Sequence, residues 1–120
     1  MKNYAEVMNV VLSVLIANAG LISEDEAAEL VGVSPRRFRV IFRSVFGESF
    51  RVMRVRIRME AARKQLVETN RSIADICEVL GYSKRDKMER LFKEHFGVTP
   101  AQYRHTQKII QNDRSGGRHK

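Results

Sequence analysis

The chain has 120 residues, with 22 Lys and Arg against 14 Asp and Glu, which gives a net charge of +8. This length allows one domain or two very small lobes, each with a core. The single cysteine, Cys77, excludes a disulfide framework and favours a reducing compartment, and no apolar run reaches the ~20 residues of a membrane span.

Helix signals follow one another along the chain, and no stretch alternates as a strand requires. Ser34-Pro35 and Thr99-Pro100 have the order of an N-cap and a first helical residue. The capping-box spacing recurs in four pairs: Ser23 with Glu26, Ser72 with Asp75, Ser83 with Asp86, and Thr99 with Gln102. These signals predict an all-α fold of about seven helices, over residues 4–18, 24–31, 35–46, 50–67, 73–80, 84–96 and 100–111.

The first predicted helix, residues 4–18, is apolar over more than half of its circumference. We expect it to lie across the first lobe, and the alternative is a partly bare face that binds a partner or a second copy. Ala17-Asn18-Ala19 also fits a signal-peptide cleavage site, but Lys2 is alone and opposed by Glu6, which favours an amphipathic helix.

The next two helices, residues 24–31 and 35–46, form a pattern that occurs twice. The motif Ala-x3-Gly-x-Ser from Ala28 returns as Cys-x3-Gly-x-Ser from Cys77, an offset of 49 residues. The motif Phe-x3-Phe-Gly from Phe42 returns from Phe92, an offset of 50, so the second copy gains one residue. Each copy is a short helix, a turn with Gly, and a longer helix, which predicts two helix-turn-helix subdomains.

Positive charge is concentrated between residues 34 and 64, which hold ten basic residues, nine of them Arg, against two acids. A charge run is usually a solvated face, but such a face mixes signs and this one does not, which favours a polyanionic partner. In the helix over 35–46, one side holds the apolar residues Phe38, Ile41, Phe42 and Val45. The opposite side holds Arg36, Val40 and Arg43, with Arg37 and Arg39 flanking. A polar outer face is what reading of the major groove requires.

The helix over residues 50–67 is apolar on two opposed faces, so it must pack on two bodies and connect them. One face holds Val52, Val55, Met59, Ala62 and Leu66, and the other holds Phe50, Met53, Ile57 and Ala61.

The second copy ends in a helix of mixed charge, residues 84–96. Asp86 and Glu89 stand among its basic residues, and mixed signs favour sequence discrimination. These acids have two open roles: accepting a hydrogen bond from cytosine N4, or orienting Arg85 or Arg90. The predicted organisation is therefore residues 1–49 for the first helix and lobe, 50–68 for the linker helix, 69–112 for the second lobe, and 113–120 for a flexible tail.

The chain resembles the DNA-binding unit of the AraC/XylS family of bacterial transcription regulators. The resemblance covers about residues 23–105 and rests on the Gly-Val-Ser-Pro-Arg-Arg-Phe segment at 32–38, the Arg-Met-x2-Ala-x3-Leu pattern at 58–66, and the segment 73–104 with Gly-Val-Thr-Pro at 97–100. It implies two helix-turn-helix lobes whose second helices enter adjacent major-groove segments about one helical turn apart. Val40 departs from the family, which often has Arg at that position.

Carried onto this sequence, the resemblance implies base contacts from both second helices. These residues are Arg36, Arg39, Val40, Arg85, Asp86, Glu89 and Arg90. Phosphate contacts are expected from the cations Arg37, Arg43, Lys84, Lys93 and Arg104.

The predicted function is therefore a sequence-specific, double-stranded DNA-binding transcription regulator, an activator in the bacterial cytoplasm at the nucleoid. The alternatives are a non-specific or architectural nucleic-acid binder and a protein-interaction module that modulates another regulator. No nucleophile motif, catalytic dyad or phosphate loop indicates an enzyme, and the three histidines lack metal-ligand spacing with Cys77, so we expect neither a metal nor a cofactor.

The resemblance also bears on partners. The chain is similar in size to stand-alone members, which act as monomers and contact RNA polymerase. We therefore expect a monomer without a small-molecule effector domain and without a membrane partner. Self-association through the N-terminal helix is the alternative.

Overall fold

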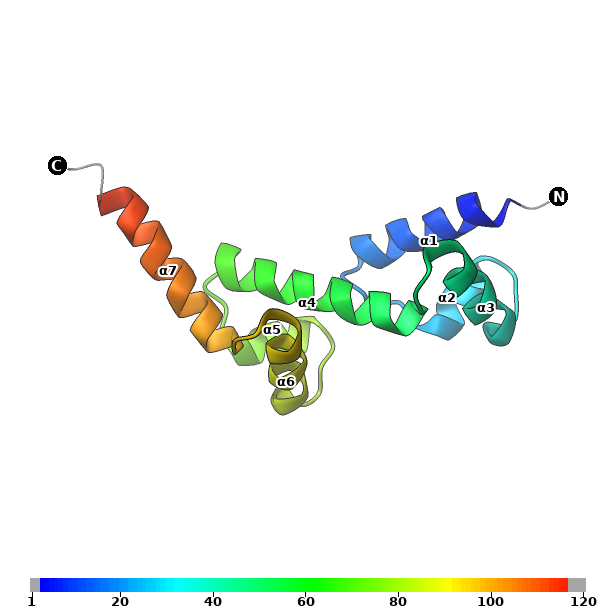
Figure 1. Ribbon diagram of the computed structural model, residues 1–120. Coiled ribbons are helices and arrows are strands. Elements are labelled where there is room, and N and C mark those ends of the chain that lie inside the picture. The colour runs from blue at the N-terminus through cyan, green and yellow to red at the C-terminus, as the bar shows by residue number, and fades with distance from the viewer. Residues whose placement is uncertain (1–2, 117–120) are drawn as a thin grey trace. The chain divides into compact units, whose positions relative to one another are not determined.

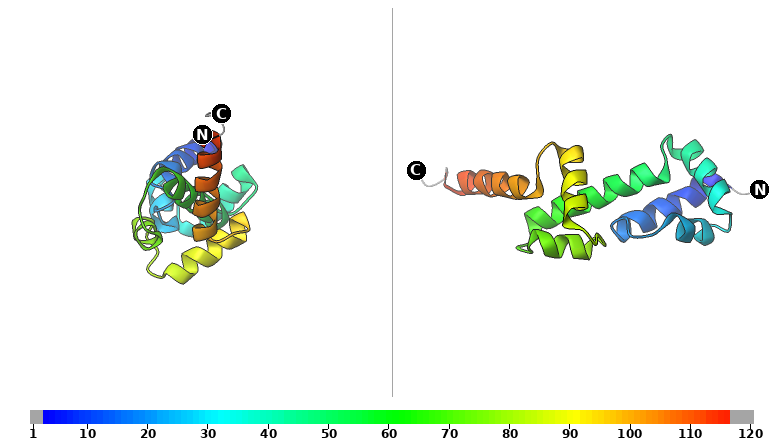
Figure 2. Two further views of the ribbon diagram at one scale, coloured as in Figure 1. Left: turned by 90° about the vertical axis from the view of Figure 1, so that its left-hand side faces the viewer. Right: turned by 90° about the horizontal axis from the view of Figure 1, so that it is seen from below.

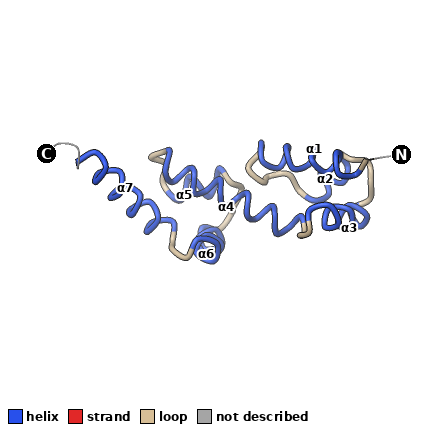
Figure 3. The backbone as a smooth tube through the Cα atoms, turned by 45° about the horizontal axis from the view of Figure 1, so that its top comes forward, coloured by secondary structure: helices blue, strands red, loops and turns tan. Residues whose placement is uncertain are grey.

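The structure is a computed structural model that describes residues 3–116, the last three as backbone alone. The described residues form seven helices and no strand (Figures 1 and 3). The helices are α1 (Tyr4–Ala17), α2 (Glu24–Leu30), α3 (Pro35–Phe46), α4 (Phe50–Glu68), α5 (Ile73–Val79), α6 (Arg85–Phe96) and α7 (Pro100–Gly116). The all-α prediction is confirmed, and every helix begins within one residue of its predicted start.

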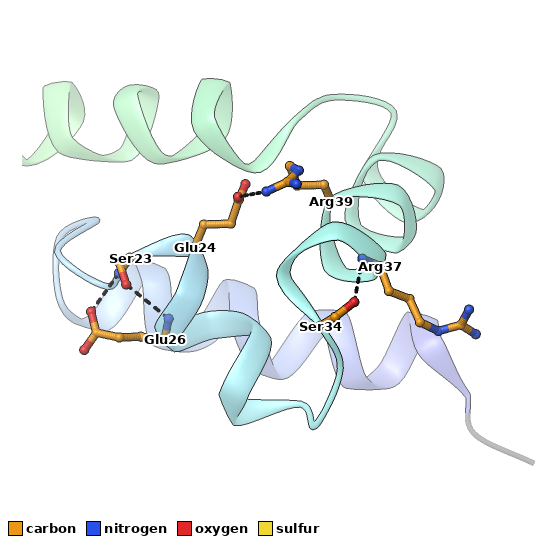
Figure 4. Close-up of polar contacts among 6 residues, drawn as sticks. All are labelled: Ser23, Glu24, Glu26, Ser34, Arg37 and Arg39. Carbon is orange, nitrogen blue, oxygen red and sulfur yellow. Dashed lines mark hydrogen bonds and ion pairs between the residues drawn. The ribbon is translucent and has the colours of Figure 1, made fainter.

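Side-chain caps explain why most of these starts could be predicted. Ser23 and Glu26 form a complete capping box at α2, in which each side chain accepts a hydrogen bond from the other residue's backbone N–H (Figure 4). At α3, Ser34 Oγ accepts from the backbone N–H of Arg37 at 3.2 Å. Thr99 and Gln102 form a second complete box at α7.

The predicted cap of α6, Ser83, is wrong, and the helix begins one residue later than predicted. The N-cap of α6 is Lys84, whose side chain makes no capping hydrogen bond, and the helix begins at Arg85. The physical reason is the additional residue of the second copy, which lies between Ser83 and the helix and moves Ser83 out of capping position. From their first residues to the left-handed glycines Gly47 and Gly97 that end them, α3 and α6 therefore match at a constant offset of 50.

The last helix is longer than predicted. We expected it to end at residue 111 and the chain to continue as a flexible tail from residue 113. Instead, α7 continues to Gly116, and residues 117–120 of that predicted tail lie outside the described residues.

The chain divides into two compact units, and the boundary falls after Arg58, inside α4. In the first unit, α1 packs beside α3 (Figures 1 and 2). The α1 residues Met8, Val11 and Leu15 are fully buried in its core, whereas Val10 and Ile16 of the same helix are exposed. Phenylalanines of α3 and α4 complete this core in edge-on and tilted pairs of Phe38, Phe42 and Phe50.

The second unit has its own aromatic pairs, in which Phe92 contacts Phe96 and the Tyr103 of α7. Cys77 is buried there, and burial raises the pKa of its thiol, as expected of a small core residue rather than a reactive one. No helix in the described part of the chain is long and apolar enough to cross a bilayer.

The two-sided helix α4 contributes to both units. Its residues Phe50 and Met53 belong to the core of the first unit, whereas Met59 and Leu66 are buried in the second. One expected member of its buried stripe is wrong: Val52 is 53% exposed.

Two arginines, one in each unit, donate hydrogen bonds to backbone carbonyls near helix ends. Arg54 of α4 donates from Nε to the carbonyl oxygen of Gly20 at 2.8 Å, in the α1–α2 connection. Arg104 of α7 stands 50 residues later and donates to the carbonyl oxygens of Leu66 and Thr69, at the end of α4. In each unit an arginine thus donates hydrogen bonds to carbonyls at the end of a helix or just after it.

Candidate nucleic-acid interface

The outer face of α3 is basic from end to end. The inner face of α3 buries Phe38, Ile41 and Phe42 and so fixes the rotation of the helix. Its outer face exposes four arginines and a valine: Arg36, Arg37, Arg39, Val40 and Arg43. The helix contains no acid, although acids normally occupy a first turn, as three do in α2. Such a face attracts anions.

One of these arginines is held by α1. The guanidinium of Arg37 donates a hydrogen bond to Tyr4 Oη at 3.1 Å and lies 5.7 Å from the centre of the Tyr4 ring. The hydrogen bond to Tyr4 raises the pKa of Arg37, which is charged at neutral pH like every arginine. Because Tyr4 is half-buried against the core, the pair places a cation at the N-terminal end of α3.

A second arginine is paired with α2. Arg39 Nη1 lies 2.6 Å from Glu24 Oε1 (Figure 4), and the two side chains are 54% and 28% exposed. An exposed pair of this kind contributes at most about 1 kcal/mol. Glu24 therefore orients Arg39 through a weak ion pair, and a phosphate or a base edge can displace Glu24 from the guanidinium.

A shallow hollow of about 520 Å³ opens on the outer face of α3, beside the N-terminal end of α1. Its lining includes Tyr4 of α1 and Arg36, Arg37, Val40 and Ser44 of α3. The hollow thus combines apolar surface with cationic edges.

The outer face of α6 repeats these positions with different residues. At the constant offset of 50, Arg36, Arg39 and Val40 are replaced by Asp86, Glu89 and Arg90. The helix carries four basic and three acidic residues, whereas α3 carries four basic residues alone. The two faces therefore have one geometry but different electrostatics.

One of the two roles left open for the acids of α6 is supported for Glu89. Its carboxylate forms an ion pair with Arg85 Nε at 3.0 Å, one turn apart on the helix. Glu89 therefore orients Arg85 in the structure, while Asp86, Arg90, Lys84 and Lys93 are exposed.

Arg104 is placed differently from the other expected phosphate contacts. Besides the carbonyls of Leu66 and Thr69, its guanidinium donates to that of Arg71, so each of its three nitrogens has a backbone partner. This geometry gives Arg104 a structural role, because its guanidinium nitrogens are already bound to backbone carbonyls.

Sequence reasoning missed two residues that contact arginines of α3, Tyr4 and Glu24, and one that stabilises the first unit, Arg54. Tyr4 and Glu24 contact arginines that are 33 and 15 residues away, and no local pattern indicates such pairs. A signal did exist for Arg54, because Arg104 repeats it at the offset of 50. Among the described residues, no group of three or more His, Cys, Asp or Glu could hold a metal ion.

Comparison with known proteins places this geometry in a family. A family model described as a helix-turn-helix domain matches residues 27–106. Over 79 residues, the chain is 38% identical to an HTH-type transcriptional regulator of Mycobacterium tuberculosis, an alignment that covers 66% of this chain and 30% of that protein. It is 34% identical over 83 residues to the transcriptional activator NphR of Rhodococcus, covering 69% and 24%. The chain thus spans less than a third of the length of these relatives.

Solved structures have the same fold. An AraC-type transcriptional regulator from Chromobacterium violaceum superposes with a TM-score of 0.72 at 29% identity, over 80% of this chain and 87% of that chain. The DNA-binding domain of AdpA, solved in complex with a target DNA, has a TM-score of 0.78 at 21% identity, over 88% and 96%. The matched family is one of DNA-binding domains rather than of enzymes.

Proposed function

This chain belongs to the AraC/XylS family of helix-turn-helix domains, and on that premise we propose that it binds double-stranded DNA sequence-specifically and regulates transcription. One observation carries the proposal. The helices α3 and α6 match residue by residue, and each buries an apolar inner face while it exposes a polar outer face. A helix exposed in this way fits the major groove, where each base pair presents a distinct pattern of donors and acceptors.

The two helices have complementary roles in this proposal. Base edges are contacted by Arg36, Arg39 and Val40 of α3 and by Arg85, Asp86, Glu89 and Arg90 of α6. Phosphates are contacted by Arg37, Arg43, Lys84 and Lys93. Support comes from the exposure of these side chains, apart from the half-buried Glu89, and from the absence of acids on α3. Phosphate contacts supply most of the affinity and base contacts supply the discrimination.

The target is a site without two-fold symmetry. Because Arg36, Arg39 and Val40 correspond to Asp86, Glu89 and Arg90, the two helices cannot read the same base sequence. We expect two different half-elements, centred about 10–11 bp apart so that both helices reach one face of the duplex. A single chain would then occupy the site as a monomer.

We propose that the chain activates transcription. Activation is supported by the name of one relative, the transcriptional activator NphR. Contact with RNA polymerase is the route to activation that we propose. A protein whose ligand is chromosomal DNA acts in the bacterial cytoplasm at the nucleoid.

A competition titration tests the proposal against its alternatives. The target site is first recovered by selection from random duplexes. We expect a labelled duplex that carries this selected site to stay bound under an excess of bulk genomic DNA, at ~0.15 M salt. An architectural binder, which the basic face of α3 alone would suit, would be displaced by bulk DNA in proportion to its mass.

Variants separate the remaining alternative, a protein-interaction module. Arg36→Ala combined with Arg90→Ala should abolish binding to the selected site and the regulatory activity together. Lys108→Ala, which removes an exposed charge from α7, is the matched control and should change little. A double variant that keeps its regulatory activity would contradict the proposal and favour a protein partner.

A further inference from the structure

We infer that Val40 reads the C5-methyl group of a thymine in the half-element that α3 contacts. The inference rests on the proposed function and adds to it the identity of one base and the chemistry that recognises it. Its first support is exposure. Val40 is 68% exposed, more than any other large hydrophobic side chain in the described part of the chain.

The position of Val40 on α3 rules out a role in the core. With 3.6 residues per turn, Val40 lies on the same side as Arg36, Arg43 and Ser44. The opposite side is filled by fully buried Phe38 and Phe42, so the helix cannot rotate to bury the valine. Val40 therefore stands near the middle of the face that would enter the groove.

The surroundings of Val40 favour a nucleic acid over an apolar protein partner. Arg36, Arg39 and Arg43 lie within one turn of it and are all exposed. An apolar protein surface placed on Val40 would strip water from these guanidinium groups without replacing it, at a high cost. DNA covers the valine and at the same time offers phosphates and base acceptors to the arginines.

Thymine has the one apolar group that the major groove presents. Its C5-methyl group stands beside the O4 acceptor, and apolar side chains contact this methyl in protein–DNA interfaces. The hollow on α3 is lined by the apolar side chains of Val40, Ile41 and Val45 and also by Arg36. A thymine methyl on Val40 would bring O4 and the neighbouring bases within the reach of that arginine.

The second helix provides an internal comparison. Arg90 occupies the position of Val40 in α6, and the two helices have identical lengths and the same glycine end. An arginine at this place forks onto guanine O6 and N7. The same site on two matched helices thus selects thymine in one half-element and guanine in the other.

The experiment uses the full chain and its selected duplex, in which each thymine is replaced in turn by deoxyuridine, which lacks only the methyl group. We expect one replacement, in the half-element read by α3, to weaken binding about four-fold, as expected for one methyl-sized apolar contact. Val40→Ala should weaken binding to the unmodified duplex by a similar factor and should be insensitive to that replacement. Val52→Ala, another exposed valine but on α4, is the control and should retain the sensitivity.

A swap gives an independent readout. Selection with Val40→Arg should replace thymine by guanine at that one position and leave the other half-element unchanged. The inference is overturned if no thymine of the α3 half-element is sensitive to deoxyuridine, or if Val40→Ala keeps the sensitivity. Failure of the proposed function looks different, because the wild-type chain would then select no sequence at all.

Discussion

Arginine has two different uses in this molecule, and surroundings decide which one applies. Arg54 and Arg104 point their N–H groups at backbone carbonyls and stabilise the fold. Arg36 and Arg43 are exposed on a helix that contains no acid. A count of basic residues cannot separate the two uses, because both add equally to the net charge.

Backbone conformation at Gly20 leads to a prediction about stability. Gly20 has φ +79°, and a Cβ there would lie 2.4 Å from Arg58 Cγ. Gly32 has a similar φ of +73°, but its surroundings are open. We expect Gly32→Ala to lower the free energy of unfolding by about 1–2 kcal/mol through backbone strain alone. Gly20→Ala should cost clearly more, because Arg58 must also move; equal losses in urea denaturation would contradict this account.

The uncapped start of α6 provides a second prediction. Lys84 occupies the N-cap without a capping hydrogen bond, whereas Ser34 caps α3. We expect Lys84→Ser to raise the free energy of unfolding by about 1 kcal/mol, and Ser34→Ala to lower it by a similar amount. If Lys84 contacts a phosphate, Lys84→Ser should also reduce the slope of log affinity against log salt by about one. A substitution that stabilises without changing this slope would remove Lys84 from the interface.

At the scale of elements, contacts within each unit restrain arginine side chains of α3 and α6. In the first unit, Glu24 of α2 holds Arg39, and Tyr4 of α1 holds Arg37. In the second, Glu89 holds Arg85 from within α6 itself. Under the proposed function, Glu24 of the short helix α2 would therefore compete with DNA for Arg39 of α3.

Removal of this competitor should tighten binding. We expect Glu24→Gln to increase the affinity for duplex DNA, because Arg39 is released from its ion pair to contact a base edge. Glu29→Gln removes the same charge from an exposed position of α2 and serves as the control. Equal gains from both variants would attribute the effect to net charge rather than to the pair. The measurement is fluorescence anisotropy over a range of salt concentrations.

The two arginine–carbonyl contacts should act locally. Arg54→Ala leaves the carbonyls of Gly20 and Leu21 without their donor, and Arg104→Ala does the same to Leu66, Thr69 and Arg71. Loss of such charge-assisted hydrogen bonds costs on the order of 2–3 kcal/mol. Hydrogen exchange should show lost protection mainly in residues 3–58 for Arg54→Ala and in residues 59–116 for Arg104→Ala. Uniform loss from either variant would contradict two separately stabilised units.

At the scale of the whole molecule, the fold was largely predictable because its helix boundaries are local. Caps such as Ser23 and left-handed glycines such as Gly47 act within a few residues of the chain. The start of α6 was misjudged because one added residue displaced Ser83 from the cap. The site was only partly predictable: the outer faces follow from helical period, but the contacts of Arg37 and Arg104 join residues 33 or more positions apart.

The central claim is that two matched helices read two different half-elements of one DNA site. Selection from random duplexes at ~0.15 M salt with bulk competitor tests it most directly, with the wild type, Arg36→Ala and Arg90→Ala side by side. The account predicts an asymmetric motif with half-elements about 10–11 bp apart. Arg36→Ala should relax one half, and Arg90→Ala should relax only the other. Tight, salt-sensitive binding that selects no motif, or one variant that relaxes both halves, would contradict it.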